Sequence, residues 1–122
     1  PDFSLIKQYV ALLKTENVFS NLYVNKQKMK ENLDGAGGLP MAEAFVIALG
    51  KTELGRQNAH ELIRSITMDA EKKGIKFSDN IKTNDEVQKY LGNEEILHCL
   101  EPENYIGHSQ EIVDQVLASI NE

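Results

Sequence analysis

Three side chains on one predicted helix could carry out proton transfer. His60 stands next to Glu61 and one turn before Arg64, so one interpretation is an imidazole base oriented by a charged neighbour. A catalytic base needs a partner within about 3 Å in a cleft, and spacing alone does not provide one. Since a single helix histidine is more often a surface or packing residue, we predict a structural role for His60. We assign no catalytic residue to this chain.

Metal-binding residue types occur without the spacing that a metal site requires. His98 and Cys99, followed by His108, offer two imidazoles and one thiol, but this spacing matches no common zinc signature. We therefore predict no metal ligands. Cys99 lies between two leucines and is interpreted as a small buried hydrophobe.

Two further segments could bind anions but favour simpler interpretations. The glycines of the segment 34–38 precede a helix start, where backbone N–H groups can cradle phosphate. Without a preceding strand or a G-K-S/T sequence, this segment is interpreted as a turn, and no cofactor is predicted. Lys26, Lys28 and Lys30 lack interleaved aromatic residues, so they indicate a solvated helix face.

The composition is typical of one globular domain. The chain has 122 residues, of which 41% are hydrophobic and 26% charged. No apolar run approaches the ~20 residues that span a bilayer, no signal-peptide pattern opens the chain, and the single cysteine cannot form an internal disulfide. The net charge of -6 repels phosphate backbones and anionic lipid. We therefore expect a cytoplasmic protein without nucleic-acid or membrane partners.

Helical spacing dominates the chain, which predicts an all-α fold. Asn25 and Gly55 are predicted N-caps, and Thr83 with Glu86 forms a predicted capping box. Gly74 is predicted to end the helix that begins near Gly55. Asn93 is the predicted cap of a further helix. The expected helices cover residues 3–22, 26–33, 40–50, 55–73, 83–91, 93–102 and 109–120.

The predicted helices differ in how they should be buried. The helix over 55–73 has one apolar face, made of Ala59, Leu62, Ile63, Ile66 and Ala70. The helix over 3–22 is apolar around most of its circumference, so it requires burial on several sides and should self-associate. Tyr9, Met41 and Phe45 are interpreted as core residues. Tyr105 and Gly107 are expected to form a turn that directs the last helix, with its apolar positions 112, 113, 116, 117 and 120, back onto the helix over 55–73.

Four segments resemble one known family in the order in which they occur. Gly38 to Ala44 is similar to G-L-x-M-A-E-A, and Leu54 to Arg64 resembles L-G-R-Q-x-A-H-x-x-I/V-R. Leu100 to Gly107 resembles L-D/E-P-x-x-Y-x-G, and Ser109 to Leu117 follows A/S-x-x-x-V-D-x-V-L. With these motifs, nearly the whole chain resembles the C-terminal domain of the adenylosuccinate lyase and 3-carboxy-cis,cis-muconate cycloisomerase branch of the fumarase/aspartase superfamily.

The resemblance implies a domain organisation and implies that the catalytic residues lie in other parts of the enzyme. Residues 1–24 correspond to the end of a central helical-bundle domain, and residues 25–122 to a helical C-terminal domain. The family's serine loop, similar to S-S-x-M-P-x-K-x-N, its phosphate-binding segment and its acid histidine have no counterpart here. Because the chain also starts at Pro1 without methionine, we expect a fragment that is inactive by itself. The family works without metal or organic cofactor.

Three functions remain open. The leading expectation is the C-terminal part of an adenylosuccinate lyase, which the resemblance implies to be a homotetramer that eliminates fumarate from a small-molecule substrate in purine biosynthesis. The second is a fragment of a 3-carboxy-cis,cis-muconate cycloisomerase, which the motifs R-Q-x-A-H and M-A-E-A somewhat favour. A non-catalytic helical interaction module, which binds a partner through the first helix, is the third.

Overall fold

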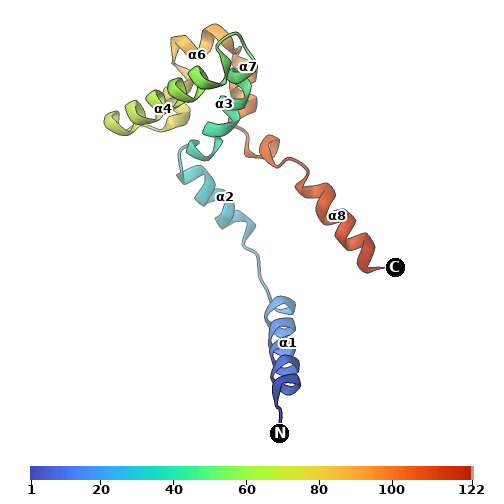
Figure 1. The fold of residues 1–122 in the computed structure, drawn as a ribbon. Coiled ribbons are helices and arrows are strands. Elements are labelled where there is room, and N and C mark those ends of the chain that lie inside the picture. The colour runs from blue at the N-terminus through green and yellow to red at the C-terminus, as the bar shows by residue number, and fades with distance from the viewer. Residues whose placement is uncertain (122) are drawn as a thin grey trace. The chain divides into compact units, whose positions relative to one another are not determined.

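Helices make up the regular structure throughout residues 1–121, the part of the chain that the computed structural model describes, and this part contains no strand. The all-α prediction is therefore confirmed. In chain order (Figure 1), the segments are α1 (Ser4–Ser20), α2 (Lys26–Gly35), η1 (Leu39–Met41), α3 (Ala42–Gly50), α4 (Gly55–Lys73), α5 (Phe77–Lys82), α6 (Asp85–Tyr90), α7 (Asn93–Leu100), η2 (Pro102–Tyr105) and α8 (Ser109–Ile120).

The chain divides into two units, the first over Pro1–Lys30 and the second from Glu31 onward. The first unit contains α1, and the second contains α3 to α8. The predicted assignment of residues 1–24 to the end of a bundle domain stays a prediction.

The core of the second unit lies between α3 and α4. Helix α5 packs on α4, α7 packs on α3, and α5, α6 and α7 all contribute side chains. Phe45 and Leu49 of α3 are completely buried, as the prediction for Phe45 requires. The ring of Phe45 meets the edge of the Phe77 ring at a centroid distance of 5.9 Å and an interplanar angle of 79°, which is a favourable aromatic geometry. The buried cluster consists of Phe45, Val46, Leu49, Ala59, Leu62, Ile63, Ile66, Phe77, Ile81, Val87, Leu91 and Ile96.

Helix α4 confirms its sequence prediction closely. Its buried residues are the five that the apolar spacing selects. Gly74 adopts a left-handed conformation directly after the helix, with φ 66°. Since glycine enters this region without a Cβ clash, Gly74 ends the helix as predicted. Leu54, and not Gly55, occupies the N-cap position.

The cap of α6 was predicted wrongly. Asn84 is the N-cap, because its side-chain oxygen accepts from the backbone N–H groups of Glu86 and Val87 at 3.1 and 3.0 Å. The Thr83 hydroxyl instead donates backwards to the carbonyl oxygens of Asp79 and Asn80, at the end of α5. The sequence interpretation missed α5, which has only six residues.

The cap of α7 lies one residue before its predicted position. Gly92 is the N-cap, and its N–H donates to the Glu95 carboxylate at 2.9 Å. Asn93 is thus the first residue of the helix. By contrast, Asn25 caps α2 as predicted, since its side-chain oxygen accepts from the Lys28 N–H at 2.9 Å.

A glycine turn joins α2 to the second unit's core. The Gly37 carbonyl accepts from the Ser78 N–H at 2.9 Å, which brings the turn against the start of α5. A Cβ at Gly38 would lie 3.0 Å from the Ser78 Cβ, and the φ of Gly38 is +84°. Both the space and the backbone conformation therefore require glycine here.

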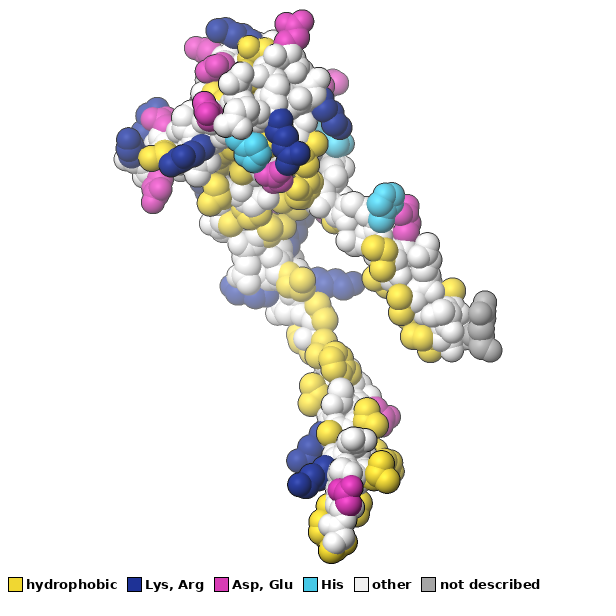
Figure 2. All heavy atoms as spheres, in the orientation of Figure 1, with side chains coloured by type: hydrophobic (Ala, Val, Ile, Leu, Met, Phe, Trp, Pro, Cys, Tyr) yellow, Lys and Arg dark blue, Asp and Glu magenta, His cyan; other side chains and the backbone are white. Residues whose placement is uncertain are grey.

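Helices α1 and α8 expose their apolar residues. No residue of either helix is buried, and Figure 2 shows hydrophobic side chains along both. Tyr9 is 64% exposed, so the core position predicted for it is not formed within this chain alone. The prediction that α8 packs back onto α4 was wrong, since all residues of α8 are exposed, although Gly107 has the expected positive φ of 55°.

None of the described helices alone has the length and apolar character to cross a membrane. The pair Lys26–Gly35 and Leu39–Gly50 reaches those limits only when its two parts, bent by 80°, are taken together.

Asn80 is the buried polar residue of the described core, and it fastens α5 to α4. Its amide nitrogen donates to the Ile66 carbonyl at 2.9 Å and to the Asp69 carboxylate at 3.1 Å. Lys73 approaches the same carboxylate at 2.6 Å. Hydrogen bonds from Lys73 and then Asn80 lower the pKa of Asp69 below its ordinary value.

We expect the chain to self-associate, because the apolar residues of α1 are all exposed and monomers rarely tolerate large exposed apolar patches. Light scattering should give a mass that rises above 13.7 kDa with concentration. Replacing Leu12 and Leu13 of α1 by Glu should shift the chain towards monomer. Leu97→Glu, at an exposed leucine of α7, is the matched control and should not. A monomer at every concentration would contradict this prediction.

We expect Asn80→Ala to lower the free energy of unfolding by about 1–2 kcal/mol, since the buried hydrogen bonds from α5 to α4 are lost. Urea denaturation followed by circular dichroism measures this change. Asn32→Ala, at an exposed asparagine of α2, should change the same quantity by less than about 0.5 kcal/mol. Equal effects of the two substitutions would show that Asn80 does not fasten the two helices.

Candidate functional site

His60 is exposed on the surface of α4. His60 and Arg64 are exposed on the polar face of α4, and neither forms a hydrogen bond or ion pair with another described residue. Glu61 instead accepts a hydrogen bond from Gln57, at 3.3 Å along the same helix. None of the described residues is placed to orient an imidazole base at His60, and the neighbouring Ala59 and Leu62 are buried in the core.

The other candidate histidines and Cys99 lie in two different places. His98 and Cys99 are on α7 and line a pocket, whereas His108 precedes α8 and pairs with Glu111 there. Among residues 1–121, no three His, Cys, Asp or Glu side chains gather closely enough to hold a metal ion. Cys99 is half-buried and packs against the core cluster, which partly agrees with its interpretation as a buried hydrophobe.

The predicted turn and basic face are where the sequence analysis put them. Gly37 and Gly38 have positive φ in the turn before η1, and the Gly37 carbonyl is used in the hydrogen bond to Ser78. Lys26, Lys28 and Lys30 are exposed on α2. Of the three predicted core residues, Met41 is 7% exposed and joins Phe45 in the interior.

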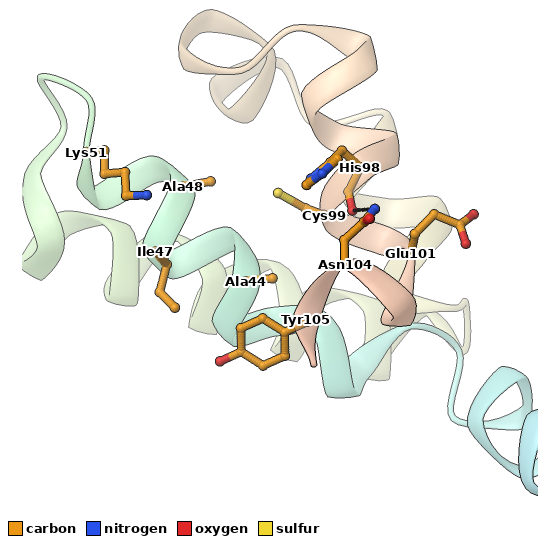
Figure 3. Close-up of a pocket in the computed structure, with 9 residues that line it drawn as sticks. All are labelled: Ala44, Ile47, Ala48, Lys51, His98, Cys99, Glu101, Asn104 and Tyr105. Atoms are coloured by element: carbon orange, nitrogen blue, oxygen red, sulfur yellow. Dashed lines mark hydrogen bonds between the residues drawn. The ribbon is translucent and has the colours of Figure 1, made fainter. Parts of the chain in front are cut away.

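A pocket of about 260 Å³ lies between α3 on one side and α7 with η2 on the other. Its α3 wall exists because Ala44 and Ala48, one turn apart, carry side chains too small to reach α7. Figure 3 shows the Cys99 sulfur directed towards Ala48 and the Tyr105 ring beside Ala44. The pocket is lined by Ala44, Ile47, Ala48, Lys51, His98, Cys99, Glu101, Asn104 and Tyr105.

Polar groups form the rim of this pocket. Lys51 extends from the end of α3 towards Ala48, and the His98 ring extends from α7 towards α3 (Figure 3). The Asn104 amide donates to the His98 carbonyl at 3.1 Å, which fixes η2 against the end of α7. The rim can therefore bind a polar group above an apolar floor.

The pocket does not activate its thiol for catalysis. Burial, and then the nearby Glu95 carboxylate, raise the pKa of Cys99, so the protonated thiol is favoured at neutral pH. The described residues include no hydrogen bond between the Cys99 sulfur and the His98 ring. A nucleophile paired with a base is thus missing, and the arrangement supports binding.

Sequence reasoning missed this pocket and the roles of Lys51 and Asn104. The only usable signal was the pair of alanines at positions 44 and 48, which indicates a shallow helix surface wherever another element crosses it. Which element crosses it is a matter of tertiary packing.

Comparison with known proteins gives one family, and its relatives include two kinds of enzyme. Residues 38–116 match the family model described as adenylosuccinate lyase C-terminus. The adenylosuccinate lyase of Methanocaldococcus jannaschii is 39% identical over 99 residues, which are 81% of this chain and 21% of that lyase. The 3-carboxy-cis,cis-muconate cycloisomerase of Acinetobacter baylyi is 37% identical over 109 residues, which are 88% of this chain and 24% of that enzyme.

A solved structure agrees with the sequence relatives. The crystal structure of a beta-carboxy-cis,cis-muconate cycloisomerase from Acinetobacter calcoaceticus superposes with a TM-score of 0.77 at 33% identity. The match covers 89% of this chain and 25% of that one. The chain thus spans about a quarter of the length of the proteins that it resembles.

Proposed function

Because the chain belongs to the adenylosuccinate lyase C-terminal family, within the fumarase/aspartase superfamily, we propose that it is the C-terminal part of an adenylosuccinate lyase. Such an enzyme eliminates fumarate from adenylosuccinate in purine biosynthesis. The family match over residues 38–116 is the observation that carries this proposal. The archaeal lyase that is 39% identical supports it.

In this proposal the chain contributes structure, and the chemistry belongs to the rest of the enzyme. The sequence contains no segment similar to the family's serine loop, S-S-x-M-P-x-K-x-N. His60 is exposed without a hydrogen-bond partner, and Cys99 has a raised pKa. No described group is therefore prepared to remove a proton from a substrate, so the chain by itself should be inactive.

The exposed helices support an assembly role. We propose that α1 packs against other helices in a homotetramer of the full-length enzyme, because its apolar residues surround the helix and none is buried. Neither a cofactor nor a metal is part of the proposal. The acidic net charge supports a cytoplasmic protein that does not bind nucleic acid or membranes.

A 3-carboxy-cis,cis-muconate cycloisomerase is the alternative enzyme. Its support is the 37% identity to the Acinetobacter baylyi protein, which differs little from the identity to the archaeal lyase, and the TM-score of 0.77. A non-catalytic helical module is the alternative outside enzymes. The exposed apolar residues of α1 and α8 are what such a module would use to bind a partner.

An assay of the full-length polypeptide that carries these 122 residues distinguishes the three functions. We expect turnover of adenylosuccinate and little turnover of 3-carboxy-cis,cis-muconate. The 122-residue chain, as the control, should turn over neither. The reverse preference would establish the cycloisomerase. If translation begins at Pro1, or if the full-length protein is a folded tetramer that acts on neither compound, the proposal is wrong.

We expect His60→Ala to leave kcat of the full-length enzyme within about twofold of its original value, since an exposed residue without partners contributes little to a transition state. Steady-state kinetics, with the oligomeric state checked by light scattering, measure this. Arg64→Ala, one turn along the same exposed face, is the matched control and should behave alike. A thousand-fold loss in an intact tetramer would identify His60 as a catalytic residue.

A further inference from the structure

The apolar part of the pocket between α3 and α7, called its floor, is suited to a flat apolar group. Ala44 and Ala48 line one side of this floor, and the Cys99 thiol with the Tyr105 ring lines the other. Removing a flat hydrocarbon from water against such surfaces is favourable. The volume of about 260 Å³ lies just below the range of pockets that hold drug-sized molecules, so the occupant is smaller than those.

The rim of the pocket favours an anion. Lys51 lines the pocket at the end of α3, its side chain points towards Ala48, and it has no ion-pair partner among the described residues. The His98 ring points towards α3 from α7 and supplies a second N–H donor. The rim's carboxylate, Glu101, is directed away from α3 in Figure 3, so it does not neutralise Lys51.

We propose that this pocket binds a small, flat monocarboxylate of the benzoate class. The ring lies between Ala48 and Cys99, and the carboxylate accepts hydrogen bonds from Lys51 and His98. A charge-assisted contact at an open rim and one buried ring correspond to a dissociation constant on the order of 1 mM. The proposal does not depend on which enzyme the full-length protein is, since it rests on the residues that line the pocket.

Cys99 provides a direct reporter of occupancy, because it is the chain's single cysteine and lines the pocket. The experiment follows the modification rate of Cys99 by methyl methanethiosulfonate at one fixed pH, with and without 10 mM benzoate. A bound ring covers the sulfur, so the rate should fall roughly tenfold at ten times the dissociation constant. Benzamide, which has the same shape without the charge, should protect little.

Matched variants separate the anion contact from general effects. Lys51→Met should remove most of the protection by benzoate, measured as the ratio of the protected to the unprotected rate of the same variant. Lys82→Met, at an exposed lysine of α5, should retain full protection. Ala44→Leu fills the floor and should also abolish protection, and circular dichroism checks that each variant is folded.

The outcomes decide the proposal in either direction. Protection by benzoate that benzamide does not share, and that requires Lys51, supports an anion site. Equal protection by the two compounds would show an apolar crevice without anion recognition, and the proposal would fail. It would fail equally if benzoate gave no protection of the original chain, or if folded Lys51→Met kept it.

Discussion

The burial of Phe45 between α3, α4 and α5 is the constraint on which the second unit depends. Its side chain has no exposed surface, and its ring meets Phe77 edge-on. Because α3 is held against α4 on this face, its opposite side, with Ala44 and Ala48, is left for α7 and η2. The same helix therefore builds the core with its large residues and the pocket with its small ones. A void opened at Phe45 would disturb both.

The parts of the fold that follow from local spacing could be read from the sequence. The apolar face of α4 runs from Ala59 to Ala70, about three turns, so periodicity alone identified every buried residue of that helix. The six-residue α5 is too short for periodicity to reveal, and Thr83 and Asn84 are both good caps, so the choice between them rested on where α5 ends. The core position predicted for Tyr9 is not formed within the chain. Its spacing is that of a buried helix, but no residue of α1 is buried here.

The candidate site was less accessible to sequence reasoning than the fold. His60 and Cys99 attract attention because of their chemistry, yet the structure leaves the first in solvent and gives the second a raised pKa. Lys51 and Asn104 belong to common residue types in a chain rich in polar side chains. Their importance arises only where the end of α3 meets η2, which depends on the packing of segments some fifty residues apart. The family motifs, by contrast, are contiguous, and the match over residues 38–116 recovers them.

The exposed apolar stripe of α8 has a consequence for the behaviour of the chain in solution. The stripe lies in the more acidic half, where residues 62–122 carry twelve Asp and Glu against six Lys and Arg, and α8 itself has two acids and no base. Two copies that approach through this helix bring hydrophobic attraction and like-charge repulsion to the same place. Salt screens the repulsion over about 10 Å at 0.1 M and leaves the attraction in place. Ionic strength thus sets the balance between a dispersed and an associating protein, so low-salt buffers favour its colloidal stability.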